Sequence, residues 1–163
     1  MEVVLVSDTH IPARASRIPE VVRRRIRHAD HVIHAGDFDS AGTLADVRDL
    51  APSLTAVAGN MDPSVGLPSV ALVSIGGVEF VVTHGTGSRR GYESRVSTTV
   101  RQEAETASPV GVAGHTHEVL DTEVEGVRLL NPGSATGAAP ATRATMMTAR
   151  AVGGDLDVTV QEI

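Results

Sequence analysis

Apolar runs alternate with helical patterns through the first third of the chain. Residues 2–6 (EVVLV) form a short run that is apolar after Glu2, as in strands covered on both faces. In residues 18–27, apolar side chains recur at helical spacing with arginines between them. Ser40 is a candidate N-cap for a later helix. The expected strands are 2–6, 31–34 and 54–58, and the expected helices are 18–27 and 40–50. This β-α-β-α-β order predicts parallel strands joined by crossover helices.

The remainder of the chain carries hairpin patterns. Gly76-Gly77 separates two apolar runs, and Glu125-Gly126 separates two more, which is typical of tight turns between antiparallel strands. A polar, arginine-bearing helix is expected at 92–104. The strands expected here are 70–75, 78–83, 110–113, 119–124, 127–130, 144–152 and 156–161. With a parallel first half and a mostly antiparallel second half, we expect two sheets packed face to face, with helices outside.

Composition restricts the class of protein. The chain has 163 residues and 41% hydrophobic residues, so we expect one domain, 1–163, with a sizeable core. No apolar stretch is long enough to span a membrane. The first expected strand begins at Glu2 and leaves no room for a signal peptide, so we expect a cytoplasmic protein. Because there is no cysteine, a bound metal must have nitrogen or oxygen ligands.

The charge balance disfavours one class of partner. All 14 basic residues are arginine, against 20 acidic residues, and the formal net charge is -6. A chain of this charge is a poor candidate for binding long nucleic acid through its phosphates. A small phosphate ester stays compatible, because bound cations supply positive charge locally.

Metal-binding residue types follow the expected strands. Asp8 and His10 come directly after the first strand, and Asp37 comes after the second. Such positions line one shared crevice in parallel α/β sheets. Any one of them is compatible with an ordinary turn, since Asp and Asn favour turns. The full set is Asp8, His10, Asp37, Asn60, His84, His115 and His117, each near a glycine or another small residue. Their occurrence at successive strand ends predicts a metal site.

These motifs identify a family resemblance. The series D-x-H, GD, GN, H and GHTH, with NPGS at 131–134, resembles the calcineurin-like metallophosphoesterases, and within them the small single-domain phosphodiesterases. The resemblance extends over residues 3–138. It implies an α/β fold of four layers, an αββα sandwich of two mixed β-sheets flanked by helices.

The resemblance also implies two divalent metal ions. Mn²⁺ is the first expectation, with Zn²⁺, Fe²⁺, Ni²⁺ and Mg²⁺ as alternatives. It further implies a hydrolase that cleaves a small phosphate ester by in-line attack of a metal-bridging hydroxide. Asp37, Asn60 and His84 are the implied catalytic residues. The implied ligands are Asp8, His10, Asp37 and His117 for the first ion, and Asp37, Asn60, His84 and His115 for the second, with Asp37 bridging.

Two positions depart from the family pattern. Met61 stands where many larger members have a histidine that donates a proton to the leaving group. Loss of a general acid typically costs about 10²–10⁴-fold in rate, so esters with good leaving groups are expected as substrates. Thr86 stands where small relatives often have a second histidine, a change that removes no implied ligand.

A non-catalytic alternative stays open. DTHIPA at 8–13 and NPGSATGA at 131–138 resemble stretches of the small metallophosphoesterase-like scaffold subunit of the retromer coat. That relative lacks an acid matching Asp37, whereas this chain keeps every ligand type, which favours the enzyme. A phosphomonoesterase is a third alternative, disfavoured by Met61. The expected partner is a small phosphate ester, with neither long nucleic acid nor membrane; a homo-oligomer is compatible with the sequence.

Several polar residues near the motifs have competing interpretations. Asp39 and Asp62 suit turn roles better than roles as acceptors beside the metals. His34 is expected to be a packed histidine, and the segment 131–134 a structural turn. Arg89, with Arg90 beside it, is a weaker candidate for contacting a substrate phosphate.

Overall fold

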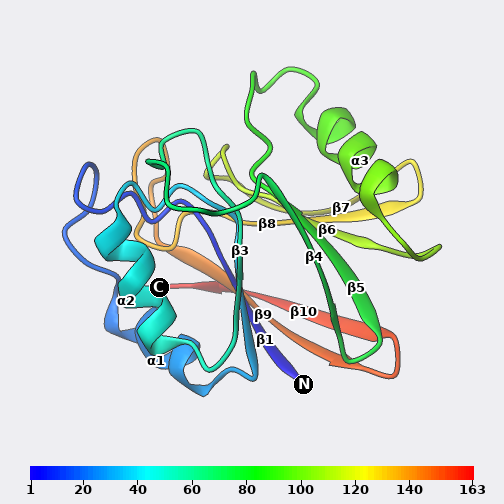
Figure 1. The fold of residues 1–163 in the computed structure, drawn as a ribbon, viewed down its shortest axis with the longest axis horizontal. Helices are drawn as coiled ribbons and strands as arrows, with labels where there is room; N and C mark the ends of the chain where they lie inside the picture. Colours follow the sequence, from blue (N-terminus) through cyan, green and yellow to red (C-terminus); the bar gives the residue numbers. More distant parts are fainter.

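The computed structural model describes residues 1–163 and has two five-stranded β-sheets and three α-helices (Figure 1). The helices are α1 (Glu20–His28), α2 (Ala41–Leu50) and α3 (Tyr92–Glu103). The strands are β1 (Glu2–Val6), β2 (His31–His34), β3 (Leu54–Ala56), β4 (Val70–Ile75), β5 (Val78–Thr83), β6 (Val110–Val112), β7 (Val119–Val124), β8 (Val127–Pro132), β9 (Thr145–Val152) and β10 (Asp155–Glu162).

The first sheet has the order β10-β9-β1-β2-β3. Strands β1, β2 and β3 are parallel, as the β-α-β-α-β pattern predicts, and Ser40 caps α2 by accepting a hydrogen bond from the Thr43 backbone N–H. Helix α1 begins at Glu20 instead of residue 18, because Pro19 takes an extended conformation (ψ 142°) at the N-cap position. The C-terminal hairpin β9-β10 pairs antiparallel with β1 and makes this sheet mixed.

The second sheet has the order β4-β5-β6-β8-β7. Its hairpins β4-β5 and β7-β8 are antiparallel, as the glycine-containing turns predict. However, β5 pairs parallel with β6, and β6 pairs parallel with β8. Helix α3 connects β5 to β6 as a crossover, so the second half contains more parallel pairing than the hairpin patterns alone predicted.

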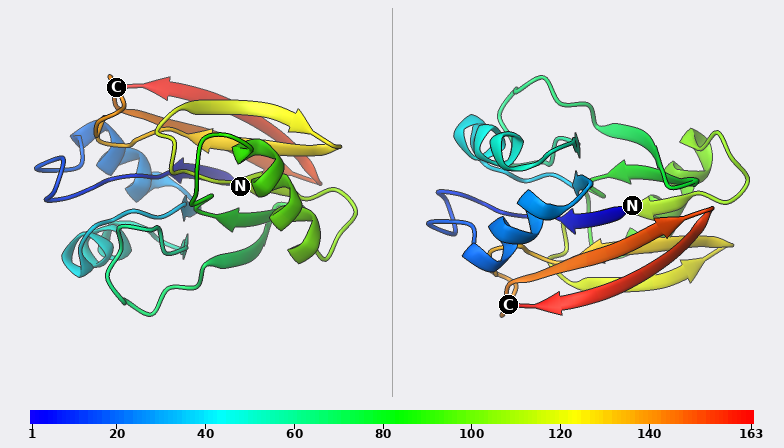
Figure 2. Two further views of the ribbon diagram at one scale, coloured as in Figure 1. Left: turned by 90° about the horizontal axis from the view of Figure 1, so that it is seen from above. Right: turned by 90° about the horizontal axis from the view of Figure 1, so that it is seen from below.

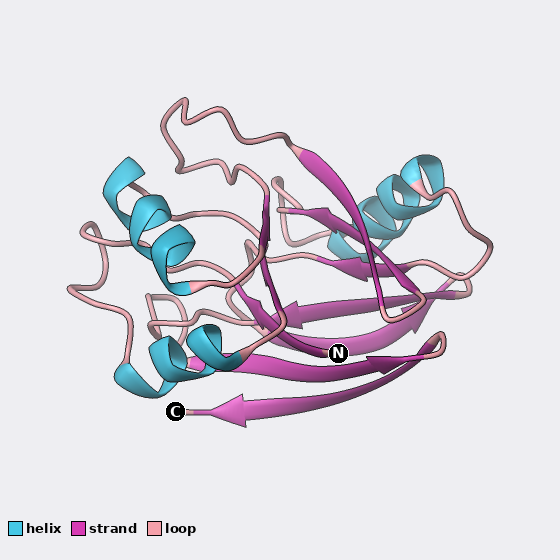
Figure 3. Ribbon diagram, turned by 60° about the horizontal axis from the view of Figure 1, so that its bottom comes forward, coloured by secondary structure: helices cyan, strands magenta, loops and turns pink.

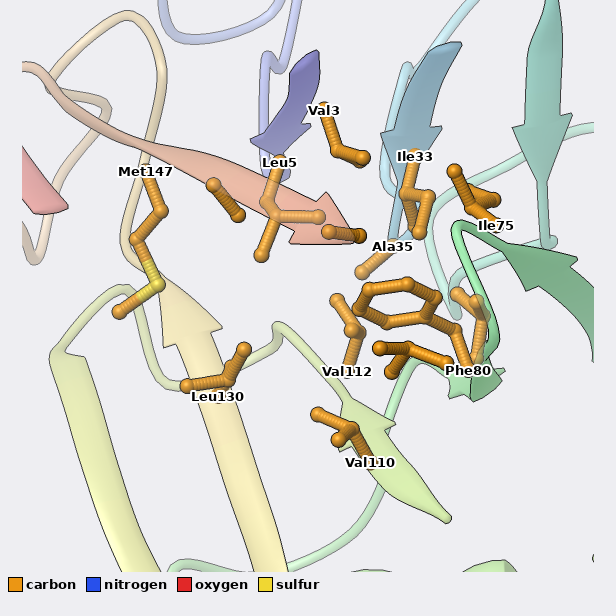
Figure 4. Close-up of a cluster of buried hydrophobic side chains, with 14 of the residues drawn as sticks. Val3, Leu5, Ile33, Ala35, Ile75, Phe80, Val110, Val112, Leu130 and Met147 are labelled. Atoms are coloured by element: carbon orange, nitrogen blue, oxygen red, sulfur yellow. The ribbon is translucent and has the colours of Figure 1, made fainter. Parts of the chain in front are cut away.

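The four layers follow from alternating side chains. In β1, Val3 and Leu5 point into the core between the sheets (Figure 4). Val4 and Val6 belong to a second cluster, with residues of α1 and α2. A third cluster packs α3 onto the second sheet. Helices α1 and α2 therefore cover one face of the stacked sheets and α3 the other (Figures 2 and 3), which confirms the expected αββα sandwich. Each fully buried Val or Leu stabilises this arrangement by about 1.5–3 kcal/mol.

No helix of the structure has the length and apolarity needed to cross a membrane. The loops after β1, β2 and β3 gather at one end of the first sheet (Figure 1), beside those after β5 and β6 of the second. The predicted metal-binding residues follow these five strands.

Candidate metal centre

The structure brings the predicted donors together in two groups. Within each of the two groups below, the candidate ligand atoms lie within 4.8 Å of one another. Asn60 adjoins the second group, with its Oδ1 3.1 Å from His115 Nδ1. The first group is Asp8, His10 and His117, and the second is Asp37, His84 and His115. All seven predicted residues thus meet at one end of the sheets.

Asp37 lies between the two groups. Its Oδ2 is 3.5 Å from His10 Nε2, in the first group, and 3.1 Å from His84 Nε2, in the second. Its Oδ1 accepts a hydrogen bond of 2.8 Å from the Met61 backbone N–H, which fixes the carboxylate. One oxygen of Asp37 therefore faces nitrogens of both groups.

Asp8 is held in the same manner. Its Oδ2 accepts hydrogen bonds from Ser7 Oγ at 2.7 Å and from the His115 backbone N–H at 3.1 Å. Its Oδ1 lies 3.3 Å from His117 Nε2 and 3.6 Å from His10 Nε2. Oδ2 thus anchors the side chain, and Oδ1 is free to act as a ligand.

Each of the four histidines has one ring nitrogen held from outside the site. The partners are a carboxylate or a backbone carbonyl, which only accept hydrogen bonds, so the held nitrogen carries the proton and the other keeps its lone pair when the ring is neutral. This arrangement is typical of histidines that bind metals. The pairs are His10 Nδ1 with Asp39 Oδ1 (2.8 Å), His84 Nδ1 with Ala35 O (2.7 Å), His117 Nδ1 with Ala138 O (2.8 Å) and His115 Nε2 with Gly87 O (2.7 Å).

The free acceptors face one another. His10 Nε2 lies 3.1 Å from His117 Nε2, so two lone pairs meet at hydrogen-bond distance with no proton to share when both rings are neutral. The buried atoms Asp8 Oδ1 and His84 Nε2 have no hydrogen-bond partner. Buried polar atoms without partners are costly, and a cation among them removes that cost. The donor set therefore fits divalent metal ions.

The charges of the site reinforce one another. Burial acts to raise the pKa of Asp8, but the nearby imidazoles of His10, His117 and His84 outweigh it and hold that pKa below its usual range. Burial acts to lower the pKa of His84, but the neighbouring carboxylates of Asp37 and Asp8 raise it above its usual range. Asp8 accordingly stays ionised at neutral pH, as metal binding requires.

The backbone at the site is in the left-handed region at several positions that are not glycine. Such conformations are uncommon outside glycine, cost of order 1–3 kcal/mol each when strained, and concentrate at functional sites. The ligand-type residues concerned are Asp8 (φ 52°), His10 (φ 46°), Asp37 (φ 63°), His115 (φ 74°) and His117 (φ 61°). The fold thus holds five of the seven predicted residues in conformations that local preferences do not favour.

Two glycines leave room for the carboxylates of other candidate ligands. A Cβ at Gly59 would lie 2.1 Å from Asp37 Oδ1, and a Cβ at Gly114 would lie 2.7 Å from Asp8 Oδ2. The backbone of these glycines therefore lies directly against the carboxylates of Asp37 and Asp8, and neither position has room for a side chain.

The two neighbouring aspartates have different roles. Asp62 accepts hydrogen bonds from the backbone N–H groups of Asp37, Phe38, Asp39 and Gly59, as a turn-forming residue does. Asp39 also has the left-handed backbone of a turn residue (φ 73°), but its carboxylate accepts from His10 Nδ1, the role beside the metals that the sequence ranked second. Aspartate is common in turns, so the local pattern does not distinguish the two.

The other polar residues mostly follow expectation. His34 is buried and stacks on Phe38, with ring centroids 3.7 Å apart, so it is a packed histidine. Asn131 is buried and donates to the Gly114 carbonyl, which is a structural role. Arg89 pairs with Glu118 at 2.5 Å. The carbonyls of Ala35, Gly87 and Ala138 carry no sequence signal, because every residue has a carbonyl.

Comparison with known families agrees with this geometry. The model of the calcineurin-like phosphoesterase superfamily domain matches residues 1–154. The chain belongs to this superfamily. Both groups of candidate ligands, with Asp37 between them, lie within the matched residues.

Individual relatives share most of the chain. A probable metallophosphoesterase of Methanothermobacter thermautotrophicus is 38% identical over 138 residues, which cover 83% of this chain and 78% of the relative. The structure of Vps29 from Entamoeba histolytica complexed with Zn²⁺ is similar with a TM-score of 0.75 and 26% identity, covering 99% of both chains. An archaeal phosphodiesterase shares the fold with a TM-score of 0.73 and 22% identity, covering 99% of this chain and 100% of that one.

Proposed function

We propose that this calcineurin-like phosphoesterase is a phosphodiesterase that hydrolyses a small phosphate ester with two divalent cations, Mn²⁺ first among them. The observation that carries the proposal is the position of Asp37 Oδ2, 3.1 Å and 3.5 Å from nitrogens of the two ligand groups. A carboxylate shared in this way suits a pair of cations about 3.5–4 Å apart.

The residues have separate tasks in this proposal. Asp8, His10, Asp37 and His117 hold the first cation, and Asp37, Asn60, His84 and His115 hold the second. When bound, the cations lower the pKa of a water molecule and neutralise charge on the phosphoryl group. Asp37 lies between the two ligand groups and belongs to both cation sites. His84 is the buried ligand of the second site, and Asn60 is its exposed ligand.

Met61 supports a preference for diesters with good leaving groups. Its side chain is 46% exposed beside Asn60, and its backbone N–H is already used by Asp37. A thioether has no proton to donate. The expected substrates are therefore esters whose leaving groups depart without protonation, such as aryl oxides.

A scaffold is the second candidate, favoured by the similarity to Vps29. The two stretches that carry the local resemblance contact each other: Ser134 Oγ donates to Asp8 O, and Thr136 Oγ1 donates to Thr9 O. These contacts hold the backbone beside the candidate ligands Asp8 and His10. The resemblance of the two stretches to the scaffold subunit is therefore explained without a binding partner. Because a Vps29 structure contains Zn²⁺, metal binding alone does not distinguish the candidates, whereas turnover does.

The deciding experiment is an assay of metal-stripped protein on bis-aryl and mono-aryl phosphates. Mn²⁺, Zn²⁺, Fe²⁺, Ni²⁺ and Mg²⁺ are added back one at a time. We expect turnover of the diester above the monoester, highest with Mn²⁺. Asp37→Asn protein, purified in parallel, controls for contaminating phosphatases. Metal binding without turnover of either ester would favour the scaffold.

A further inference from the structure

His115 is the most exposed of the four histidines and is supported by a loop with no regular secondary structure. Its Nε2 donates to the carbonyl of Gly87 at 2.7 Å, the shorter of the two contacts that its ring nitrogens make with acceptor oxygens, and Nδ1 lies 3.1 Å from Asn60 Oδ1 at the second ligand group. Gly87 belongs to the segment 85–88, which lies between β5 and α3 (Figure 1). The orientation of the ring therefore depends on what holds this segment.

Arg95, in the first turns of α3, holds it. One guanidinium nitrogen, Nη2, donates to the carbonyl of Gly85 at 3.1 Å and to that of Ser88 at 2.9 Å. These two acceptors flank Gly87 on both sides. The backbone of Gly87 lies directly against the guanidinium, since a Cβ there would be 2.9 Å from Arg95 Cζ.

The same helix supports the other side of His115. Tyr92, whose ring lies 5.9 Å from Arg95 Cζ, donates from its hydroxyl to the carbonyl of Gly114 at 2.6 Å. Gly114 directly precedes His115. The start of α3 thus supports His115 in two ways. Tyr92 binds the backbone that precedes His115, and Arg95 binds the segment whose Gly87 carbonyl accepts from the imidazole.

We propose that Arg95 is a positioning residue for His115, and through it for the second metal site alone: it holds the 85–88 segment whose Gly87 carbonyl fixes the imidazole. This inference rests on the proposed two-metal function. No hydrogen bond or ion pair of Arg95 reaches Asp8, His10 or His117, whose ring and carboxylate partners lie elsewhere. Loss of the guanidinium therefore weakens one site and leaves the other.

The test measures Mn²⁺ binding to metal-stripped protein by calorimetry. In Arg95→Met we expect one Mn²⁺ to bind about 10–100-fold more weakly, the usual effect of removing an outer partner of a metal-binding histidine, and the other to be unchanged. Arg95→Lys, which restores a donor, should recover part of the loss. Arg101→Met is the matched control, since Arg101 lies on the same helix and pairs with Glu125 at the surface.

A second measurement reports on His115 without metal. In nitrogen-15 spectra of the metal-free protein, assigned with a His115→Gln variant, we expect His115 to carry its proton on Nε2. Arg95→Met should lose this fixed tautomer and Arg101→Met should keep it. A general loss of stability would change neither the tautomer nor one site selectively.

The outcomes separate this inference from the function on which it rests. Wild-type protein that binds fewer than two Mn²⁺ would contradict the two-metal function, and this inference with it. Wild-type protein that binds two, together with an Arg95→Met variant that also binds two at unchanged affinity, would overturn the role of Arg95 alone.

Discussion

Ser134 Oγ donates a hydrogen bond of 2.7 Å to the backbone carbonyl of Asp8, across 126 positions of sequence. The same oxygen accepts from the Ala138 backbone N–H at 2.8 Å, and the carbonyl of Ala138 holds the ring of His117. One buried hydroxyl therefore connects two candidate ligands of the first metal.

Ser134→Ala should destabilise the metal-free protein. It leaves a buried carbonyl and a buried N–H without their partner, which costs roughly 1–3 kcal/mol. Urea denaturation measures the change. Ser88→Ala is the control, because Ser88 Oγ bonds only the carbonyl of Arg90 at the surface and its loss should change stability by less than about 0.5 kcal/mol. Equal midpoints for both variants would exclude the linking role of Ser134.

Asp37→Asn should abolish diester turnover while the protein stays folded. The substitution keeps the shape of the side chain but removes the charge that faces both ligand groups. Turnover of a bis-aryl phosphate and calorimetric Mn²⁺ binding are the measurements, with Asp49→Asn on the exposed face of α2 as the control. An active Asp37→Asn protein would rule out the two-metal hypothesis.

Met61→His should raise monoester hydrolysis relative to diester hydrolysis. The exposed side chain leaves space for an imidazole, which has the proton that a thioether lacks. General acids typically contribute about 10²–10⁴-fold, and a grafted one should give a gain toward the lower end. The ratio of kcat/KM for mono-aryl and bis-aryl phosphates reports it. An unchanged ratio would mean that position 61 does not face the leaving group.

Gly59→Ala should weaken metal binding through steric displacement. Its Cβ would lie 2.1 Å from Asp37 Oδ1, so the carboxylate or the backbone must move, at a cost of about 1–3 kcal/mol. Gly42→Ala is the matched control: it lies in α2, and the nearest atom to its Cβ, Ser40 Oγ, is 3.9 Å away. That variant should be neutral or more stable by up to about 1 kcal/mol. Thermal unfolding and Mn²⁺ titration of both variants test the contrast.

His34 should make the protein sensitive to acid. Burial lowers its pKa from 6.5 to about 3, so the folded protein keeps His34 neutral where the unfolded chain binds a proton. Below pH 6.5 the unfolded state binds more protons, and the stability contributed by neutral His34 falls with pH until about pH 3. Relative to His34→Gln, the metal-free wild type should lose up to roughly 1.4 kcal/mol per pH unit.

The comparison should be made by urea denaturation at pH 7.0, 6.0 and 5.0. Taking the difference between the two proteins cancels the titration of the other histidines. A difference that stays constant across this range would show that His34 does not remain neutral in the folded state.

The sequence alone determines most of the secondary structure of this protein and the set of candidate ligands. The alternation of apolar runs and helical patterns predicts most elements to within two residues, because burial on one or both faces imposes a period on the sequence. Ser40 and the glycine-containing turns around 76–77 and 125–126 act through local backbone chemistry, which is also local in sequence. The candidate ligands were predictable because parallel strands present their carboxyl ends at one edge.

The tertiary structure decided what depends on contacts between distant segments. It attached β9 and β10 to the first sheet, and it made the second sheet partly parallel through the α3 crossover. It also chose Asp39 over Asp62 as the partner of His10, and placed Ser134 and Arg95 behind the candidate ligands. Hydrogen bonds to backbone carbonyls leave no periodic trace in the sequence, because any residue supplies the acceptor and only the fold selects which one is near.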